Sequence, residues 1–477
     1  MPGPQVSPPP TATASAVRWG QAALAGALAL ALAVLLGVLR FAPAALPVLP
    51  AVVAGALGLG MLLRRPEWHL TAVLAGFVFV FQFEEGVSPT ELAFGAYSTA
   101  YLAGWFGVAL LGSRPIVQSW SDRALVGLLV YLTLSLLWTP PRGGDIAIAL
   151  NQWRLLLILG FALPIRDVVA RGEHGARRVL LAALFATMFV VARNFLLYLE
   201  AMQSAEALWQ VVGNRATRPG ERLILVSLLA TFVFAVFEVR TVRARLALAA
   251  LAGAQLGAVV AAQGRTAWLA LILGLGAMVL LLGGRERLRL IAVVGGGAAA
   301  AAVLAWLVLG DVFGLFLVQI GERASSIGTA GTQDVSLINR FREWRTVWEV
   351  SLQSPVFGTG FGVPYRFYSV IYGATEVKHF VHSAYLSFFY RHGAVGIVLM
   401  AVALVGAFGK SVRIARRARS RFDHAVGLAC ASASVAFALA ISTEPALTTA
   451  EGPYVLALLM GLAGGTWERQ RAARGAD

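Results

Sequence analysis

The sequence predicts an all-α membrane protein, a bundle of about 12–14 transmembrane helices with one large, partly helical loop outside the membrane. Hydrophobic residues make up 58% of the 477 residues and charged residues only 13%, and the mean hydropathy is +0.74. Soluble domains average ~25% charged residues, so a single aqueous core could not hide this much apolar surface and a bilayer has to solvate it. The only cysteine, Cys430, excludes an internal disulfide or a cysteine metal site.

The apolar runs can be assigned in chain order. Residues 1–19 are rich in Pro, Ser and Thr, which predicts a disordered N-terminal segment. The next apolar run is too long for a signal-peptide core and is followed by further runs, so we expect it to be a retained first span. About eleven spans are expected within 20–310 and the rest within 388–467. The runs are 20–40, 45–63, 69–83, 92–113, 123–138, 145–163, 178–199, 222–238, 246–262, 266–283, 289–310, 388–409, 424–442 and 452–467.

Charge sets the expected orientation. Alternate short loops carry clusters of Arg, as the positive-inside rule requires of cytoplasmic loops, while the opposite loops are mostly acidic or neutral. Both termini, including the tail 468–477, are therefore expected in the cytoplasm of a bacterium with the chain in its inner membrane. A net charge of +15 would suggest nucleic acid as a partner of a soluble protein. Here the topology explains the charge, so we expect membrane lipids and no nucleic acid.

Two outer segments break the pattern of short loops. One lies near 200–221, and the other is the much longer 311–387, expected on the periplasmic side. Long loops without structure are uncommon and are usually functional. Within the second segment, Asn339–Leu352 carries apolar and aromatic residues at helical spacing.

Cationic residues on the outer side oppose the topological bias. Arg265, in Gln263-Gly264-Arg265-Thr266 between two apolar runs, is the sharpest case, since a charge at bilayer depth costs at least ~2.5 kcal/mol. A guanidinium can grip phosphate oxygens in a bidentate fork, or it can snorkel to lipid headgroups. Phosphate binding is favoured for Arg265, and snorkelling to lipid headgroups is favoured for three other arginines. Those three are Arg342, Arg345 and Arg366.

Histidines crowd into the end of the large loop, at His379, His382 and His392. An imidazole can accept a proton near neutral pH, form half of a metal site, or only cap a helix. No full ligand set accompanies them, so no metal is expected. Glu84 and Glu85 form an acidic pair that is better explained as solvated loop charge. The sequence also contains no P-loop, dinucleotide fingerprint, G-x-S-x-G or Asp-x-Asp.

An ordered set of motifs resembles the O-antigen ligase and polymerase superfamily of membrane glycosyltransferases. The pieces cover roughly 260–400, and each is weak alone, but their order around one large loop is specific. Ser383 departs from the Asn that usually follows the histidine, and Arg391-His392 replaces an acidic residue before the last Gly motif. The pieces are Gly264-Arg265-Thr266, Arg340-Phe341-Arg342-Glu343-Trp344, Pro355-Val356-Phe357-Gly358-Thr359-Gly360-Phe361-Gly362, His382-Ser383-Ala384-Tyr385-Leu386 and His392-Gly393-Ala394-Val395-Gly396.

The resemblance implies a fold like that of the GT-C-like membrane glycosyltransferases and a donor glycan on undecaprenyl pyrophosphate. It implies that His382 accepts the proton of the acceptor sugar hydroxyl or orients that hydroxyl, and that no cofactor, nucleotide or metal takes part. Trp344, Pro355 and Ser383 would shape the loop together with three glycines that allow tight turns near the ligand. Those glycines are Gly358, Gly360 and Gly362. The donor pyrophosphate would be held by Arg265, Arg215, Arg218, Arg222 and Arg340.

The acceptor stays open at this point. A ligase transfers to a lipid A core or similar anchor, a polymerase to another lipid-linked repeat, and a third relative to protein hydroxyls; we favour the ligase. From another class, a transporter or flippase for polysaccharide or anionic lipid would also explain many spans and an Arg-lined path. No matching halves or internal repeats support it. An inert scaffold subunit explains neither Arg265 nor the histidines.

Overall fold

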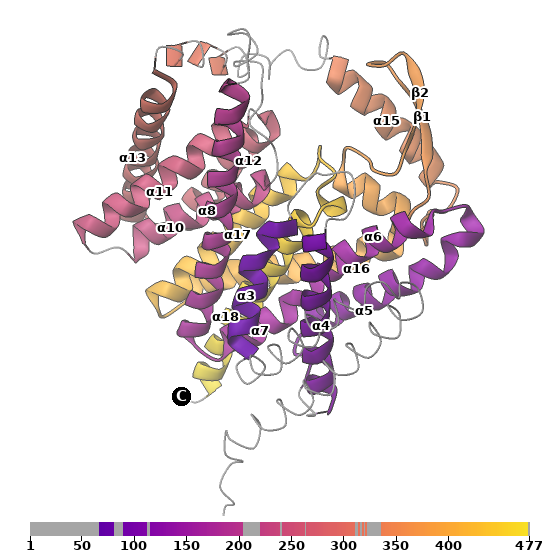
Figure 1. The fold of residues 1–477 in the computed structure, drawn as a ribbon. Helices are drawn as coiled ribbons and strands as arrows, with labels where there is room; N and C mark the ends of the chain where they lie inside the picture. The colour runs from indigo at the N-terminus through magenta and orange to yellow at the C-terminus, as the bar shows by residue number, and fades with distance from the viewer. Residues whose placement is uncertain are drawn as a thin grey trace, which may run out of the picture. The chain divides into compact units, whose positions relative to one another are not determined.

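The computed structural model describes residues 66–80, 89–111, 115–203, 220–238, 241–262, 264–310, 313–314, 317–318, 320–321 and 335–475. Within these residues the protein is mostly helical (Figure 1), and eight helices are long and apolar enough to cross a membrane. A further apolar helix, Arg265–Leu281, is shorter. The predicted polytopic helical membrane protein is thereby confirmed. The predicted spans 20–40 and 45–63 lie outside the described residues, so the count of 12–14 stays a prediction.

The described residues divide into two compact units, one made of 66–79, 89–111 and 115–118 and the other made of residue 80 and the described residues from 119 onward. In the first unit, α3 (Pro66–Gly76) continues into the 3-10 turn η2 (Phe77–Val80), whose last residue belongs to the second unit, and α4 (Pro89–Leu111) follows. His69 Nδ1 lies 2.8 Å from the Tyr97 hydroxyl, and the Phe77 and Phe94 rings pack edge to face at 5.2 Å. Aromatic contacts of this kind hold the two helices together.

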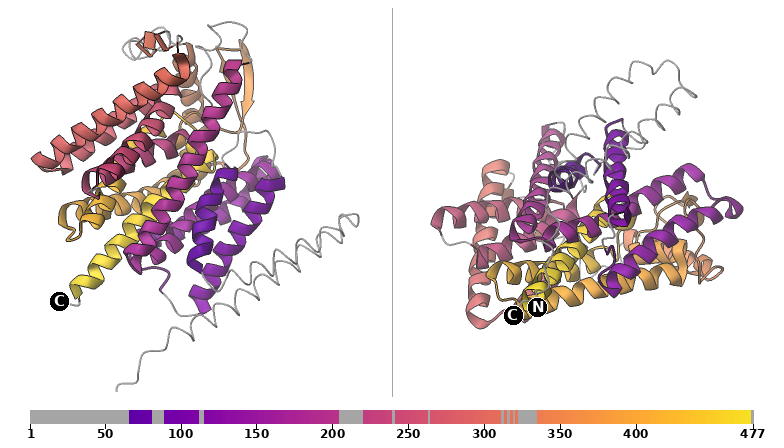
Figure 2. Two further views of the ribbon diagram at one scale, coloured as in Figure 1. Left: turned by 60° about the vertical axis from the view of Figure 1, so that its left-hand side comes forward. Right: turned by 90° about the horizontal axis from the view of Figure 1, so that it is seen from below.

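The second unit is a helical bundle that carries all the sites discussed below (Figures 1 and 2). Its closest pairs are α7 with α18, α12 with α17, α11 with α13, and α16 with both α17 and α5. Several helices start at a side-chain cap, for example at Ser119, Thr241 and Ser420. The helices are α5 (Trp120–Leu134), α6 (Ile146–Leu157), α7 (Ala162–Ala170), α8 (Glu173–Gln203), α10 (Glu221–Phe237), α11 (Val242–Ala261), α12 (Arg265–Leu281), α13 (Gly284–Leu309), α15 (Val335–Ser351), α16 (Ala384–Arg417), α17 (Arg421–Ala440) and α18 (Glu451–Gly475), with 3-10 turns η3 (Ser135–Trp138), η4 (Pro140–Arg142), η5 (Ile158–Phe161) and η7 (Ala446–Thr448).

The large loop contains the helix that the sequence predicted over Asn339–Leu352, which is α15. The sequence did not predict the antiparallel hairpin of β1 (Tyr365–Ser369) and β2 (Ala374–Lys378). Along β1, buried and exposed side chains alternate, which is the period of a half-buried strand. Val347 of α15, Tyr365, Phe367, Val381 and Tyr390 form a small core that fixes hairpin, helix and α16 together.

Helix α16 is interrupted at Gly393, whose φ of 58° and ψ of −162° leave the helical region. The glycine-rich segment 355–362 packs against this break. Gly358, Gly360 and Gly362 all have positive φ, at 69°, 93° and 68°. A Cβ at Gly358 would lie 2.3 Å from the carbonyl of Arg391, so only glycine permits this approach.

The packed segment satisfies the backbone groups that the break leaves without helical partners. Two amides of the segment donate to carbonyls before the break, and two amides after the break donate back to the segment. These bonds are Thr359 N to Tyr390 O (2.8 Å), Gly360 N to Arg391 O (2.9 Å), Ala394 N to Pro355 O (2.8 Å) and Val395 N to Val356 O (3.1 Å). The break is therefore a built feature of α16, and it sets the direction of the helix's first turns.

Candidate functional site

His382 lies directly before α16, where Ser383 caps the helix, and a buried carboxylate on α15 holds its ring. Nδ1 of His382 lies 2.9 Å from Oε2 of Glu343, and the His382 backbone amide donates to the same oxygen at 3.0 Å. The Glu343 side chain is 1% exposed and the His382 side chain 27%. Because a carboxylate only accepts, Nδ1 carries the proton in this pair, and the lone pair of Nε2 is left for another group.

Three neighbours fix this pair. The Tyr365 hydroxyl of β1 lies 2.7 Å from Glu343 Oε1 and 2.6 Å from the Phe380 carbonyl, so its one proton is directed at this pair of acceptors. The Trp344 indole donates to the His382 carbonyl at 2.9 Å. Lys378 Nζ of β2 lies 4.0 Å from Glu343 Oε1. The hairpin thus completes the surroundings of the carboxylate, and α15 contacts both the ring and the backbone of His382.

The charge states of this group follow from its contacts. Burial opposes ionisation of Glu343, but hydrogen bonds and the charge of His382, with the bond from Tyr365, outweigh it and lower the pKa of the carboxyl. Burial, followed by the charge of Glu343, raises the pKa of the Tyr365 hydroxyl. At neutral pH Glu343 is therefore an anion and Tyr365 a neutral donor, which is the arrangement that stabilises a positive charge arising on the imidazole.

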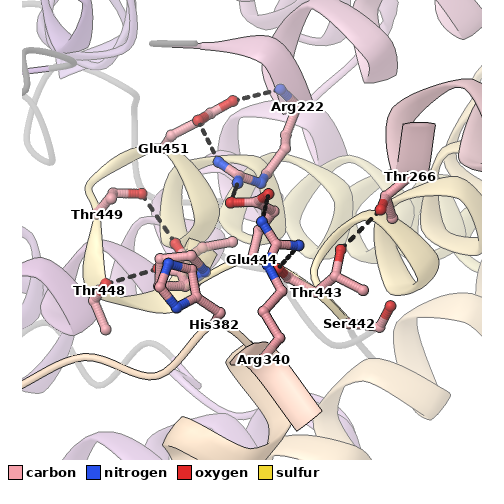
Figure 3. A network of polar contacts seen from close by, with 12 residues as sticks. Arg222, Thr266, Arg340, His382, Ser442, Thr443, Glu444, Thr448, Thr449 and Glu451 are labelled. Atoms are coloured by element: carbon pink, nitrogen blue, oxygen red, sulfur yellow. Dashed lines mark hydrogen bonds and ion pairs between the residues drawn. The ribbon is translucent and has the colours of Figure 1, made fainter. Parts of the chain in front are cut away.

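Arg340 lies one helical turn before Glu343, on the same side of α15. Its guanidinium donates to the Thr443 carbonyl at 3.1 Å and lies 3.4 Å from Glu444 Oε1. The Thr443 hydroxyl is 2.8 Å from that of Thr266, the residue after Arg265 at the start of α12. Figure 3 shows how the segment after α17 joins these elements. It brings the beginning of α12 and the helix that holds His382 into one polar network.

Arg222, at the start of α10, is the most enclosed cation of this network. Its guanidinium lies 3.0 Å from Glu451 Oε2, and Glu451 Oε1 accepts from the backbone amides of Arg222 and Leu223 at 2.6 and 2.9 Å. Glu444 Oε2 is 3.6 Å from Arg222 Nη2. The side chains of Glu451 and Arg222 are 3% and 9% exposed, against 22% for Glu444. Glu444 therefore lies between two guanidinium groups, those of Arg222 and Arg340 (Figure 3).

The structure brings His382, Trp344, Arg340 and Arg222 into this region, with Arg265 half-buried at the first residue of α12. Arg215 and Arg218 lie outside the described residues, as do Glu84 and Glu85. For five of the residues expected to shape the loop, the structure shows specific backbone or packing contacts. Pro355, Gly358 and Gly360 support the break in α16, and Ser383 caps that helix. Gly362 instead packs against the start of α6, where its amide donates to Gln152 and its carbonyl accepts from the Asp145 amide.

The two other histidines of the loop take no part in the pair. His379 contributes its backbone carbonyl, which accepts from Gln152 Nε2 at 3.2 Å. His392 is fully buried, with its ring 4.6 Å from the rings of Phe361 and of Phe388. Among the residues that the structure describes, no group of three or more His, Cys, Asp or Glu side chains is placed to hold a metal ion.

Sequence reasoning missed the acidic partners. Glu343 lies inside the motif that supplied Arg340 and Trp344, and its place among arginines, three residues after Arg340, was a usable signal. Glu444 and Glu451 were read only as outer-loop charge. Tyr365 could not be found, because its role depends on the hairpin, and no local pattern paired that strand with α15.

Residues 247–401 match a protein family described as O-antigen ligase. The matched segment runs from α11 into α16 and includes Arg265, α15, the hairpin, the glycine-rich segment and His382. Arg222, Glu444 and Glu451 lie outside it. No curated protein matches the chain.

Proposed function

We propose that this chain, which carries a domain of the O-antigen ligase family, is a membrane glycosyltransferase that moves a glycan from undecaprenyl pyrophosphate to an acceptor hydroxyl. The observation that carries the proposal is the pair of Glu343 and His382, 2.9 Å apart, with Arg340 one turn away on the same helix. A base that is held by a buried carboxylate, next to cations that suit phosphate, fits transfer of a sugar from a phosphate leaving group.

In this mechanism His382 is the general base. Its Nδ1–H donates to Glu343, and Nε2 accepts the proton of the acceptor hydroxyl as the hydroxyl oxygen attacks the anomeric carbon. The bond from that carbon to the pyrophosphate oxygen breaks in the same displacement, so the configuration at the carbon inverts. Glu343 stabilises the imidazolium that forms, as a carboxylate does in other base–orienter pairs.

The leaving group gains negative charge as this bond breaks, and stabilisation at that point contributes most to the rate. We assign this role to Arg265 and Arg340, with Arg215 and Arg218 as further candidates from the sequence. Arg222 is less suited to contact the pyrophosphate, because Glu451 and Glu444 already balance its charge. Its contribution in this proposal is to set the position of Glu444 beside Arg340.

The donor already carries an activated sugar, so the reaction needs no nucleotide, and we propose that it needs no metal. By the positive-inside pattern the site faces the periplasm, and the chain lies in the bacterial inner membrane with both termini in the cytoplasm. The acceptor we favour is a lipid A core or a similar anchor, which makes the protein a ligase. A second lipid-linked repeat as acceptor would make it a polymerase, and a protein hydroxyl an O-glycosyltransferase for protein.

The test is glycan transfer by the purified protein in nanodiscs. The protein receives a lipid-linked glycan donor with either a lipid A core or a second donor molecule as acceptor. Wild type is compared with His382→Ala and Arg265→Ala, each with and without EDTA. We expect transfer that survives EDTA and falls by roughly 10²–10⁴-fold in His382→Ala, the range for a general base.

Donor binding is measured separately and should persist in His382→Ala but weaken in Arg265→Ala. His379→Ala is a matched control, since that histidine uses its backbone carbonyl. Transfer unchanged by either substitution would mean that the site is wrongly placed. Movement of lipid-linked glycan across the bilayer without transfer to any acceptor would instead support the transporter alternative.

A further inference from the structure

Helix α15 has two different faces. Its buried side chains, Asn339, Glu343, Val347 and Ser351, follow each other at a spacing of four residues. The opposite side carries Phe341 and Trp348, seven residues apart, and Leu352 follows directly after the last residue of the helix; these are 51%, 51% and 53% exposed. We call these three residues the outer face of α15. The helix that carries the candidate site thus presents large apolar groups on the side away from it.

The apolar surface extends beyond the helix. Val356 and Phe357, in the glycine-rich segment that follows, are 50% and 54% exposed. Trp348 stacks on Phe389 of α16, with ring centroids 5.4 Å apart and planes 27° apart. Phe389 lies in the first turns of α16, before the break at Gly393, and α16 is long and apolar enough to cross a membrane, so the outer face of α15 adjoins the end of a candidate membrane span.

The polar groups beside the outer face are also informative. Arg345 lies on the same side and is 83% exposed, with Glu349 as its partner at 3.0 Å. Arg342 is exposed next to Phe341. Tryptophan combined with arginine is typical of the boundary between headgroups and acyl chains, where the ring is partly buried and the guanidinium reaches phosphate. A face with only water against it would expose these apolar groups at a free-energy cost.

We propose that the outer face of α15 lies in the headgroup region of a phospholipid bilayer, with Phe341, Trp348 and Leu352 directed into the acyl boundary. The occupant is the bilayer itself, reached by continuity with α16. Arg340 and Glu343 point the other way, so the anchored helix holds them at the level of lipid phosphates. This last consequence rests on the proposed function, whereas the membrane contact does not.

The experiment is spin labelling of the full-length protein in nanodiscs that contain anionic phospholipid. Cys430 is buried and is the only cysteine, so a Cys430→Ala background allows single labels. Labels are placed at Phe341→Cys and Leu352→Cys on the outer face, with Arg342→Cys and Glu349→Cys as matched controls beside it. Collision with oxygen, which partitions into lipid, is compared with collision with a water-soluble nickel complex.

We expect the ratio of oxygen to nickel collisions to be several-fold higher at 341 and 352 than at 342 and 349. Equal ratios with high nickel access at all four positions would overturn the proposal, because the face would then lie in water. Low access to both reagents, with spin–spin broadening, would overturn it in favour of a contact with a second copy. The collision measurements do not depend on glycan transfer. If they contradict the membrane contact, the proposed function is still tested separately by the transfer assay.

Discussion

Replacing Glu343 with Gln tests the core of the candidate site, because it removes one charge from a buried position and changes the shape very little. The carboxylate accepts three bonds, from His382 Nδ1, the His382 amide and the Tyr365 hydroxyl, at 2.9, 3.0 and 2.7 Å. A glutamine has one acceptor oxygen and one donor nitrogen. If the amide oxygen takes the place of Oε2, it still accepts from Nδ1 and from the His382 amide, the Tyr365 hydroxyl can donate to the Phe380 carbonyl 2.6 Å away, and the bond to Nδ1 loses its charge. If the amide nitrogen takes that place, Nδ1 and the His382 amide both face an N–H group, the other ring tautomer is favoured and Nε2 no longer accepts.

The size of the effect follows from the bonds lost. A hydrogen bond to a charged group contributes about 1.5–3 kcal/mol, and ~1.4 kcal/mol of barrier changes the rate tenfold. Loss of one such bond from the base therefore lowers kcat by roughly ten- to a hundredfold. The KM for the lipid-linked donor should stay near its wild-type value, because Glu343 holds the base and not the phosphate.

The assay is glycan transfer in nanodiscs with saturating donor, followed by a donor titration. Glu349→Gln is the matched control, since it makes the same change on the same helix in a side chain that is 61% exposed. Thermal unfolding of each variant separates a misfolded protein from an inactive one. A folded Glu343→Gln protein with wild-type kcat, beside an inactive His382→Ala protein, would refute the role of Glu343 in positioning the base.

Three further predictions concern stability. Because contacts lower the pKa of Glu343, its contribution is complete above the unfolded-state value of about 4.3 and is lost as pH falls through the folded-state value, so the thermal advantage of wild type over Glu343→Gln should shrink in acid below about pH 4. Glu451→Gln leaves Arg222 without its buried partner, and we expect it to lower the free energy of unfolding in detergent by about 3 kcal/mol. Glu444→Gln should cost under about 1 kcal/mol, because the ion pairs of Glu444 are longer and more exposed, and equal losses would contradict this order. Gly358→Ala should lower the unfolding temperature and reduce glycan transfer. The control is Gly373→Ala, which has a similar φ of 61° and open space around it and should show backbone strain alone. Similar effects of the two substitutions would refute the close approach of Gly358 to α16.

Much of the fold could be read from composition and periodicity, because a bilayer imposes a simple rule on helix length and polarity. The helix over Asn339–Leu352 also followed from spacing. The hairpin could not be read in this way, because five residues of alternating burial in β1 gain their meaning from β2 and α15. Strand pairing of this kind is a tertiary property and leaves little trace in a single short segment.

Some residues of the candidate site could be predicted from the sequence, and others could not. Cations and histidines could be singled out because they oppose a topological or solvation rule, and Arg340 and His382 do come together around α15. The acids that balance them violate no such rule, and only Glu343 had a local signal, its place within the motif of Arg340 and Trp344. The roles of Glu343, Glu444 and Glu451 follow from their partners, which lie from 22 up to 229 residues away in the chain.

The glycine-rich segment and the histidine act as one structural device, although they are separated in the sequence. His382 precedes the first nine residues of α16, and those residues end at the break at Gly393. The segment 355–362 fixes the direction of that short helix by bonding to both sides of the break. Glu343 then fixes the histidine ring from α15. A change at Gly358 therefore moves His382 without touching it, whereas a change at Glu343 turns the ring and leaves the helix in place. Both substitutions should lower stability and activity, but only the change at Gly358 should displace the first turns of α16.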